Sequence, residues 1–235
     1  MKMIRNTLLA AAAALVVLAA MLIVFLPHIS LRAFASAYNL DLQYKDLKRA
    51  SLSRMVFDDL TVIDRVKGIG VSSRNATIDL MWSLPNLSDS TVGFCLYDVR
   101  FVKSAGEAAA SYDTLDSLVA LPFSSNWIYK EISGKVRSSK GDVKLKDFLA
   151  KSDLLKLSLS GEIHRDNTIK SDIVIYFSDE LTRKIPPELT RLVLTQEEPG
   201  WKSLSVKLEG NYAMPTINVS SKLFRLNIGV KDSSS

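Results

Sequence analysis

The chain has 235 residues, of which 47% are hydrophobic and 23% are charged, and its formal net charge is +5. This balance excludes a disordered chain, and the part after the first thirty or so residues is long enough for one large β domain or two small ones. Lysine and arginine are spread along the sequence without a block of five or six, so no nucleic-acid-binding arm is expected, and a single cysteine, Cys95, excludes an intrachain disulfide.

A hydrophobic segment near the N-terminus predicts a transmembrane anchor. Residues 8–26 contain no charged side chain and would form a helix about 28 Å long, close to the thickness of the hydrocarbon core of a bilayer. Lys2 and Arg5 precede the segment, which by the positive-inside rule keeps the N-terminus in the cytoplasm. We therefore predict a cytoplasmic stub and single-pass anchor over residues 1–30 and an extracytoplasmic body over residues 31–235.

A cleaved signal peptide is the alternative interpretation of the same segment. Residues 33–35 (Ala-Phe-Ala) and 35–37 (Ala-Ser-Ala) both resemble the small-residue sites at which signal peptides are cut. They lie several residues beyond Pro27, and the apolar run is long for the core of a signal peptide, so we favour an uncleaved anchor.

Residues 29–38 have the apolar spacing of a short amphipathic helix. Beyond them, apolar and polar residues alternate with a period of two, which predicts β-strands. Each strand should present one apolar face and one wetter face. One predicted stripe is Ile78, Leu80 and Trp82, and the next is Cys95, Tyr97, Val99 and Phe101.

Residues 104–121 interrupt this alternation with an alanine cluster. The segment ends at Pro122, and its composition predicts a helix packed on the sheet. Alternation returns over residues 128–137 and 143–148, and the turn at residues 138–141 between them predicts a β-hairpin.

The clearest strands cover residues 155–164 and 169–177, which the turn at residues 165–167 should join into an antiparallel pair. Residues 178–192 predict short helical turns interrupted at the Pro-Pro pair 186–187, and residues 204–212 predict another strand. Consecutive strands joined by short turns predict a mainly β fold, an antiparallel meander with a few short helices.

The sequence offers little material for catalysis. It contains two histidines and no Cys-x-x-Cys, His-Glu-x-x-His, Walker or Gly-x-Ser-x-Gly motif. The run 68–70 (Gly-Ile-Gly) is predicted to be a hairpin turn, and His164 is predicted to be a surface residue on a polar stripe. We therefore expect no catalytic residue, no metal and no cofactor, and no enzymatic activity.

The order of segments resembles that of the AsmA-like family, bacterial relatives of the bridge-like lipid-transfer proteins. Residues 47–64 are similar to the opening strands of that family, and residues 141–148, 157–161 and 172–177 are similar to its repeated later strands. Residues 184–189, 204–210 and 214–217 resemble its closing segments. The resemblance covers most of the chain, although long members of the family have many hundreds of residues.

The resemblance implies a curved antiparallel sheet whose apolar inner face shields the acyl chains of phospholipids, anchored in the inner membrane of a two-membrane envelope with its body in the periplasm. On this hypothesis the protein binds or transfers lipid, or supports outer-membrane assembly. The lipid-binding stripe would consist of Leu155, Leu157, Leu159, Ile163, Ile173, Ile175, Phe177, Leu204, Val206 and Leu208.

Two alternatives stay open on the residues alone. The same stripes would arise in a closed sandwich whose inner faces pack on each other. The protein could also be a tethered structural or assembly factor that binds an envelope protein through its sheet edge, without a lipid. About a dozen strands in one row would span roughly 55 to 60 Å, so a bridging role would require a protein partner or a homo-oligomer.

Overall fold

A computed structural model describes residues 31–32, 35–36, 39–51, 53–66, 68–82, 89–103, 112–211, 214–220 and 225–229. The predicted anchor at residues 8–26 lies outside the described residues, as does most of the predicted helix at residues 29–38. Within the described ranges, no helix combines the length and the apolar character that a membrane span requires.

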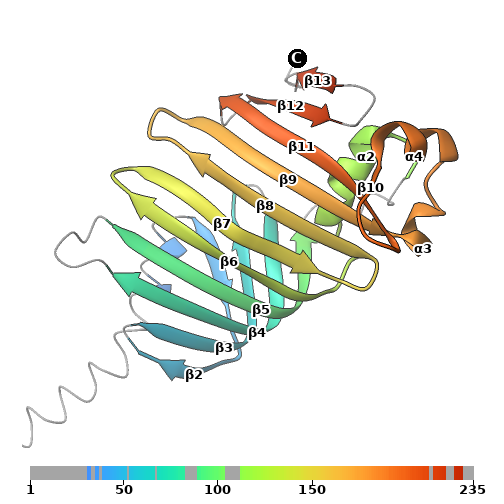
Figure 1. Ribbon diagram of the computed structural model, residues 1–235. Coiled ribbons are helices and arrows are strands. Elements are labelled where there is room, and N and C mark those ends of the chain that lie inside the picture. The colour runs from blue at the N-terminus through green and yellow to red at the C-terminus, as the bar shows by residue number, and fades with distance from the viewer. Residues whose placement is uncertain are drawn as a thin grey trace, which may run out of the picture.

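The described residues form a single antiparallel sheet of thirteen strands (Figure 1), which confirms the predicted mainly β fold. From β3 to β9 each strand pairs with the next one in sequence, and β9 is followed across the sheet by β11, β12 and β13. β1 and β2 both pair with β3, and β10 pairs with β11. The strands are β1 (Leu40–Gln43), β2 (Asp46–Ala50), β3 (Arg54–Asp64), β4 (Ile69–Trp82), β5 (Ser90–Lys103), β6 (Tyr129–Ser139), β7 (Asp142–Lys151), β8 (Leu155–Ile163), β9 (Thr168–Ser178), β10 (Thr195–Gln196), β11 (Trp201–Asn211), β12 (Met214–Ser220) and β13 (Arg225–Gly229).

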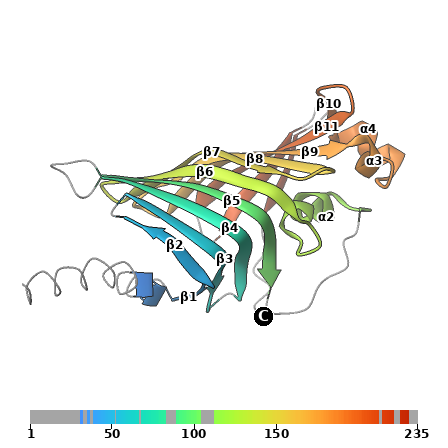
Figure 2. The ribbon, with the colours of Figure 1, turned by 90° about the horizontal axis from the view of Figure 1, so that it is seen from below.

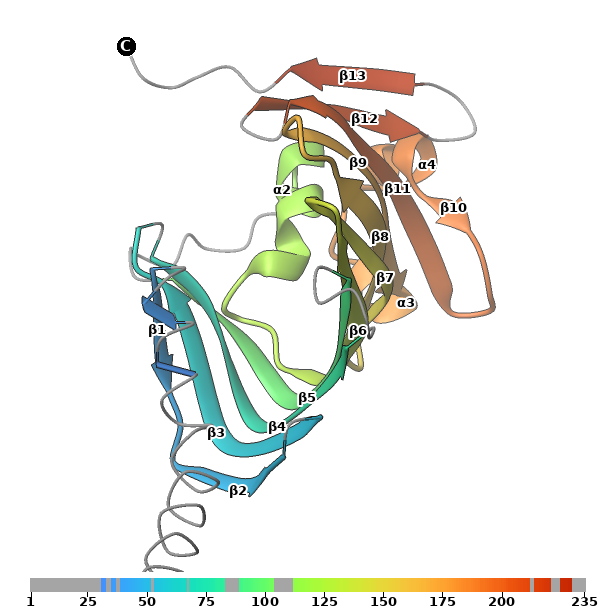
Figure 3. The same ribbon diagram turned by 90° about the vertical axis from the view of Figure 1, so that its left-hand side faces the viewer.

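The sheet is strongly curved, and the helices cover part of its concave face. Helix α2 (Leu115–Ala120) and the 3-10 turn η1 (Leu121–Phe123) lie inside the curve (Figure 3). Helices α3 (Asp179–Thr182) and α4 (Pro187–Val193) lie beyond the end of β9 (Figure 2). These two confirm the predicted short turns around the Pro-Pro pair, because a proline at the start of α4 cannot continue the preceding helix.

Helix α2 is shorter than predicted from residues 104–121. It begins at Leu115, where Thr114 and Ser117 form a capping box, and residues 104–111 lie outside the described ranges. The predicted hairpins are confirmed: the turn at Lys140 and Gly141 joins β6 to β7, and the register Leu157↔Ile175 joins β8 to β9.

A row of apolar side chains on the concave face crosses eight neighbouring strands and forms the centre of the core. Directly opposed residues in antiparallel strands share a face, so the register fixes this row. Its members are Phe57, Ala76, Leu96, Ile132, Ala150, Leu157, Ile175 and Leu204. All of them except the half-buried Leu96 are 0–3% exposed.

Strands β3 and β5 each contain one residue with a left-handed backbone at the same level of the sheet, and we call this level the crease. Asp59 in β3 and Asp98 in β5 have φ angles of 50° and 53°, and Arg74 of β4 lies between them in register. At this level the alternation of side chains shifts by one position. As a result Phe57 and Leu60, three residues apart, are both buried in the same core cluster.

The crease makes one sequence prediction wrong. Cys95, Tyr97, Val99 and Phe101 do not share a face, because the shift falls at Asp98. Tyr97 is 45% exposed on the convex side, whereas Val99 is fully buried and Phe101 packs against the core.

Candidate functional site

All ten residues of the predicted lipid-binding stripe lie on the concave face of β8, β9 and β11. The register places Leu157, Ile175 and Leu204 in one row and Leu159, Ile173 and Val206 in the next. The spacing of the stripe therefore predicted correctly which residues the fold brings together. It could not show what covers them.

Most of this stripe is packed against the protein's own helices. Leu155, Leu157, Ile175, Phe177 and Leu204 are 0% exposed, Val206 is 1% and Ile173 is 6% exposed. They belong to one core cluster together with Leu118 of α2, Leu121 of η1 and Leu181 of α3. We call this helix-covered part of the concave face the closed section.

The apolar character of the concave face continues beyond the helices toward the β6–β7 and β8–β9 turns. A further row across the sheet contains half-buried apolar residues, and a second row beyond it contains three more that are half-buried or exposed. We call these residues the open section: Leu80, Val92, Val136, Leu145, Leu208 and Ile217 in the first row, and Val143, Ile163 and Ile169 in the second.

The open section contains two residues of the predicted stripe, Leu208 and Ile163, and Leu159 lies half-buried at its border. Leu80, Val92 and Val136 were missed because they come from strands far away in the sequence. Their period-two spacing was visible, but only the register shows that they lie in line with Leu208.

Small residues occupy the centre of the open section, so few side-chain atoms project from the sheet there. Gly161 of β8 and Ser171 of β9 are opposed in the first row of the open section. A Cβ atom on Gly161 would lie 2.8 Å from the Cβ atom of Ser171, so no larger side chain fits there. The Ser171 hydroxyl donates a hydrogen bond to the carbonyl oxygen of Ser160 over 3.1 Å, so its polarity is satisfied within the sheet.

An aromatic contact borders the open section in the neighbouring row. Gly134 of β6 lies beneath the ring of Phe94, whose centroid is 6.3 Å from that of Phe148. A Cβ atom at Gly134 would lie 2.7 Å from Cζ of Phe94. The glycine therefore leaves room for the Phe94 ring against β6.

Contacts from the sheet hold η1 against the closed section. The Tyr129 hydroxyl donates a buried hydrogen bond of 2.7 Å to the carbonyl oxygen of Pro122. Phe101 packs edge-on against both Tyr129 and Phe123. Burial raises the pKa of Tyr129 above its ordinary value, so the phenol stays protonated and keeps donating.

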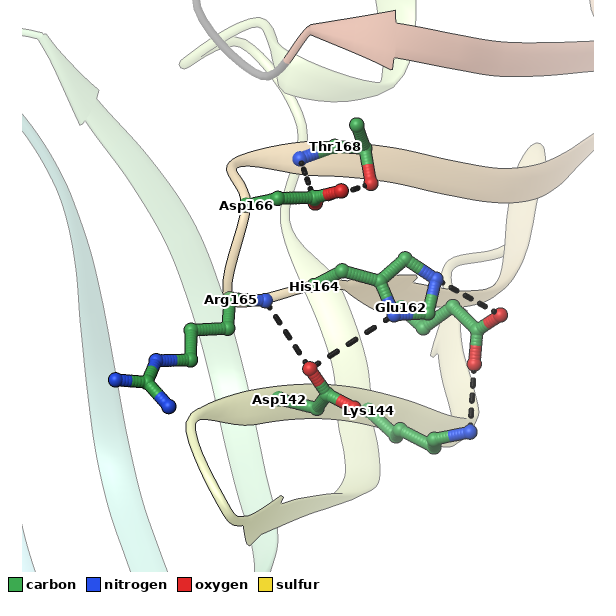
Figure 4. Close-up of polar contacts among 7 residues, drawn as sticks. All are labelled: Asp142, Lys144, Glu162, His164, Arg165, Asp166 and Thr168. Atoms are coloured by element: carbon green, nitrogen blue, oxygen red, sulfur yellow. Dashed lines mark hydrogen bonds and ion pairs between the residues drawn. The ribbon is translucent and has the colours of Figure 1, made fainter.

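The convex face carries a polar cluster at the β6–β7 and β8–β9 turns (Figure 4). The His164 imidazole lies between two carboxylates, with Nδ1 3.8 Å from Asp142 and Nε2 3.3 Å from Glu162. Lys144 Nζ lies 2.7 Å from the other oxygen of Glu162. This confirms that His164 is a surface residue on the polar stripe.

Hydrogen bonds and charges within this cluster shift the pKa values of its members. The Lys144 ammonium lowers the pKa of Glu162, and Glu162 raises the pKa of Lys144. The Thr168 hydroxyl and backbone N–H donate to Asp166 and lower the pKa of that carboxyl. Among the described residues, no group of three or more His, Cys, Asp or Glu side chains could hold a metal ion.

Comparison of the chain with protein-family models, with curated proteins and with solved structures found no match. The candidate site therefore rests on the geometry of this chain. Its chemistry is that of an apolar surface on the concave side and satisfied ion pairs on the convex side.

Proposed function

We propose that the chain is a membrane-anchored envelope protein that binds or transfers lipid, with an acyl chain lying on the open section. The observation that supports this is a row of six partly exposed apolar residues, with small residues at its centre, on a concave face whose neighbouring part is packed against helices. Burial of apolar surface against a hydrocarbon chain gains about 0.8 kcal/mol for each methylene group removed from water.

The dimensions of the open section suit one lipid tail. Its first row crosses eight strands from β4 to β12, which at about 4.8 Å per strand spans roughly 34 Å. One leaflet of a bilayer core is about 15 Å thick, so an acyl chain fits along the row. The row is too short to cross a periplasm, and bridging would need a protein partner or a homo-oligomer.

Membrane attachment is part of the same proposal. Residues 8–26 would span the inner membrane with the N-terminus in the cytoplasm, and the sheet would lie in the periplasm. This arrangement would hold the open section within reach of the lipids of the membrane that anchors it.

Site-specific photo-crosslinking in the full-length chain tests the proposal. A photoreactive amino acid at Leu208, on the open section, should form a phospholipid adduct that mass spectrometry detects on the β11 peptide. The matched control is Val174 in the adjacent strand β9, which is also half-buried and lies on the convex face. An adduct at Leu208 that is absent at Val174 supports the proposal, and equal labelling at both positions refutes it.

A second variant separates acyl-chain binding from general membrane proximity. Leu145→Asp places a charge in the same row as Leu208 and should reduce the lipid adduct at Leu208 several-fold. Leu157 is not suitable for this purpose because it is fully buried, so a charge there would unfold the sheet.

The alternative function, a tethered factor that binds an envelope protein through its sheet edge, predicts no lipid adduct at Leu208. The described edge strands have features that oppose edge pairing: β1 and β13 are four and five residues long, and Asp46, Lys48 and Arg49 place charges on β2. These features favour the lipid proposal.

A further inference from the structure

A cavity of about 530 Å³ lies between α3, α4 and the start of β11. It opens at the end of the sheet where β9 passes into α3, on the side where Lys202 is opposed to Phe177. Its lining residues are Asp179, Thr182, Arg183, Ile185, Pro187, Thr190, Arg191 and Lys202.

The charges in this cavity are mainly positive. Arg183, Arg191 and Lys202 contribute three cationic groups, against the one carboxylate of Asp179. Within the described part of the chain, none of the three cations forms an ion pair. What sets these three cations apart is that they line one cavity together, where a single anion could contact all of them.

A hydroxyl in the same cavity lacks a partner. Thr190 Oγ1 is buried and makes no hydrogen bond, whereas the Thr182 hydroxyl donates to the carbonyl oxygen of Ser178 over 2.8 Å. A buried polar atom without a partner is unfavourable and calls for an explanation. Threonine in a helix populates two χ1 rotamers, so rotation can turn this hydroxyl toward a ligand without moving the backbone.

We propose that the cavity binds a phosphate group. Two guanidinium groups can each form paired hydrogen bonds to phosphate oxygens, Lys202 adds a third cation, and the Thr190 hydroxyl gains a partner.

This site is separate from the open section. The row of Phe177 and Lys202 lies six residues along β9 and β11 from the first row of the open section, that of Ser171 and Leu208, or roughly 20 Å. One acyl chain spans about 15 Å, so a lipid on the open section does not place its phosphate in this cavity. The two proposals can therefore fail independently.

Calorimetric titration of the full-length chain with inorganic phosphate tests the inference. The double variant Arg183→Gln/Arg191→Gln should bind phosphate roughly tenfold more weakly or worse, since it loses two charge-assisted interactions. The matched control, Arg100→Gln/Arg165→Gln, removes the same charge from exposed positions on β5 and the β8–β9 turn and should keep the affinity. Absence of binding to the unmodified chain, or an equal loss in both double variants, would overturn the proposal.

Thr190→Val gives a second readout that a purely structural role would not produce. Valine has the same shape without the unpaired hydroxyl, so the variant should unfold at a higher urea concentration than the unmodified chain in the absence of phosphate. Its affinity for phosphate should fall several-fold. Unchanged affinity in Thr190→Val would contradict the part assigned to the hydroxyl.

The source of the phosphate group is distinguished by reconstitution in lipid nanodiscs. If the site takes a lipid head group, nanodiscs that contain phosphatidic acid should compete with inorganic phosphate, and nanodiscs of pure phosphatidylcholine should not. If it takes a soluble phosphate, the phosphate affinity should be the same in both. Either result supports phosphate recognition, provided that the Arg183→Gln/Arg191→Gln variant loses it.

Discussion

The glycines of the concave face are required by the side chains that lie over them. At Gly134 a Cβ atom would lie 2.7 Å from the Phe94 ring and 3.3 Å from the Cα atom of Phe148. We expect Gly134→Ala to lower the free energy of unfolding by about 1–3 kcal/mol, because the ring must leave its position or the strands must separate. Urea denaturation of the full-length chain measures this loss.

Gly93 in the neighbouring strand provides the control. A Cβ atom there meets nothing closer than 3.8 Å, so Gly93→Ala should change the stability by less than about 1 kcal/mol and can raise it by restricting the unfolded chain. Equal losses at the two glycines would show that the Phe94 ring does not require Gly134.

The convex-face ion pair predicts a measurable pKa change. Lys144→Gln removes the ammonium that lowers the pKa of Glu162, so that pKa should rise toward its ordinary value. Carboxyl-carbon NMR titration measures the shift. Asp166 serves as the internal control, because Thr168 is the main cause of its lowered pKa.

The directions of these two pKa shifts decide how the stability of the fold changes with pH. The lowered pKa of Glu162 contributes stability above its unfolded pKa, and this is lost as the pH falls through its folded value. The raised pKa of Lys144 contributes stability below its unfolded pKa, and this is lost as the pH rises through its folded value. In Lys144→Gln both dependences should flatten.

At the level of the elements, the crease is where side chains in β3 and β5 change the face to which they point. Its aspartates adopt a left-handed backbone that β-branched residues avoid, and Arg74 Nη1 lies 3.9 Å from Asp98 Oδ2 across it. We expect Asp98→Val to be less stable than Asp98→Gly by about 1–2 kcal/mol, since both lose the ion pair and only valine strains the backbone. Equal midpoints in urea would contradict the strain at this position.

The crease also explains where sequence patterns succeeded and where they failed. Uninterrupted alternation over residues 155–177 predicted both strands, their turn and their shared face correctly. In β5 the predicted alternation continued without interruption across Asp98, so it placed Tyr97 on the same apolar face as Val99, although Tyr97 is exposed and only Val99 is buried. A shift of one residue inside a strand leaves no trace in apolar spacing, because Tyr97 and Val99 are both compatible with a sheet surface.

At the scale of the whole molecule, the concave face of the sheet is divided into the closed section, which helices cover, and the open section, which they do not cover. Leu157→Ala, in the closed section, should cost about 2–5 kcal/mol because it leaves a cavity beneath the helices. Leu208→Ala, in the open section, should cost about 1 kcal/mol. Denaturant unfolding compares them, and similar losses would show that the open section is also packed core.

The sequence could predict the stripe but not this division. Leu157 and Leu208 are equivalent in period and polarity, and they differ only in whether α2, η1 and α3 lie above them. Helix placement depends on contacts such as that of Tyr129 with Pro122, which no local pattern records. The cationic cavity was missed for the same reason, since its residues come from two short helices and a strand.

The order of strand pairing has a consequence for biogenesis. From β3 to β9 each strand finds its partner in the chain segment made immediately before it. Apart from β5 and β6, which residues 104–128 separate, these pairings close short loops, which costs little entropy and favours fast folding. We therefore expect the protein to assemble one hairpin at a time, while the remaining polypeptide is still being synthesised.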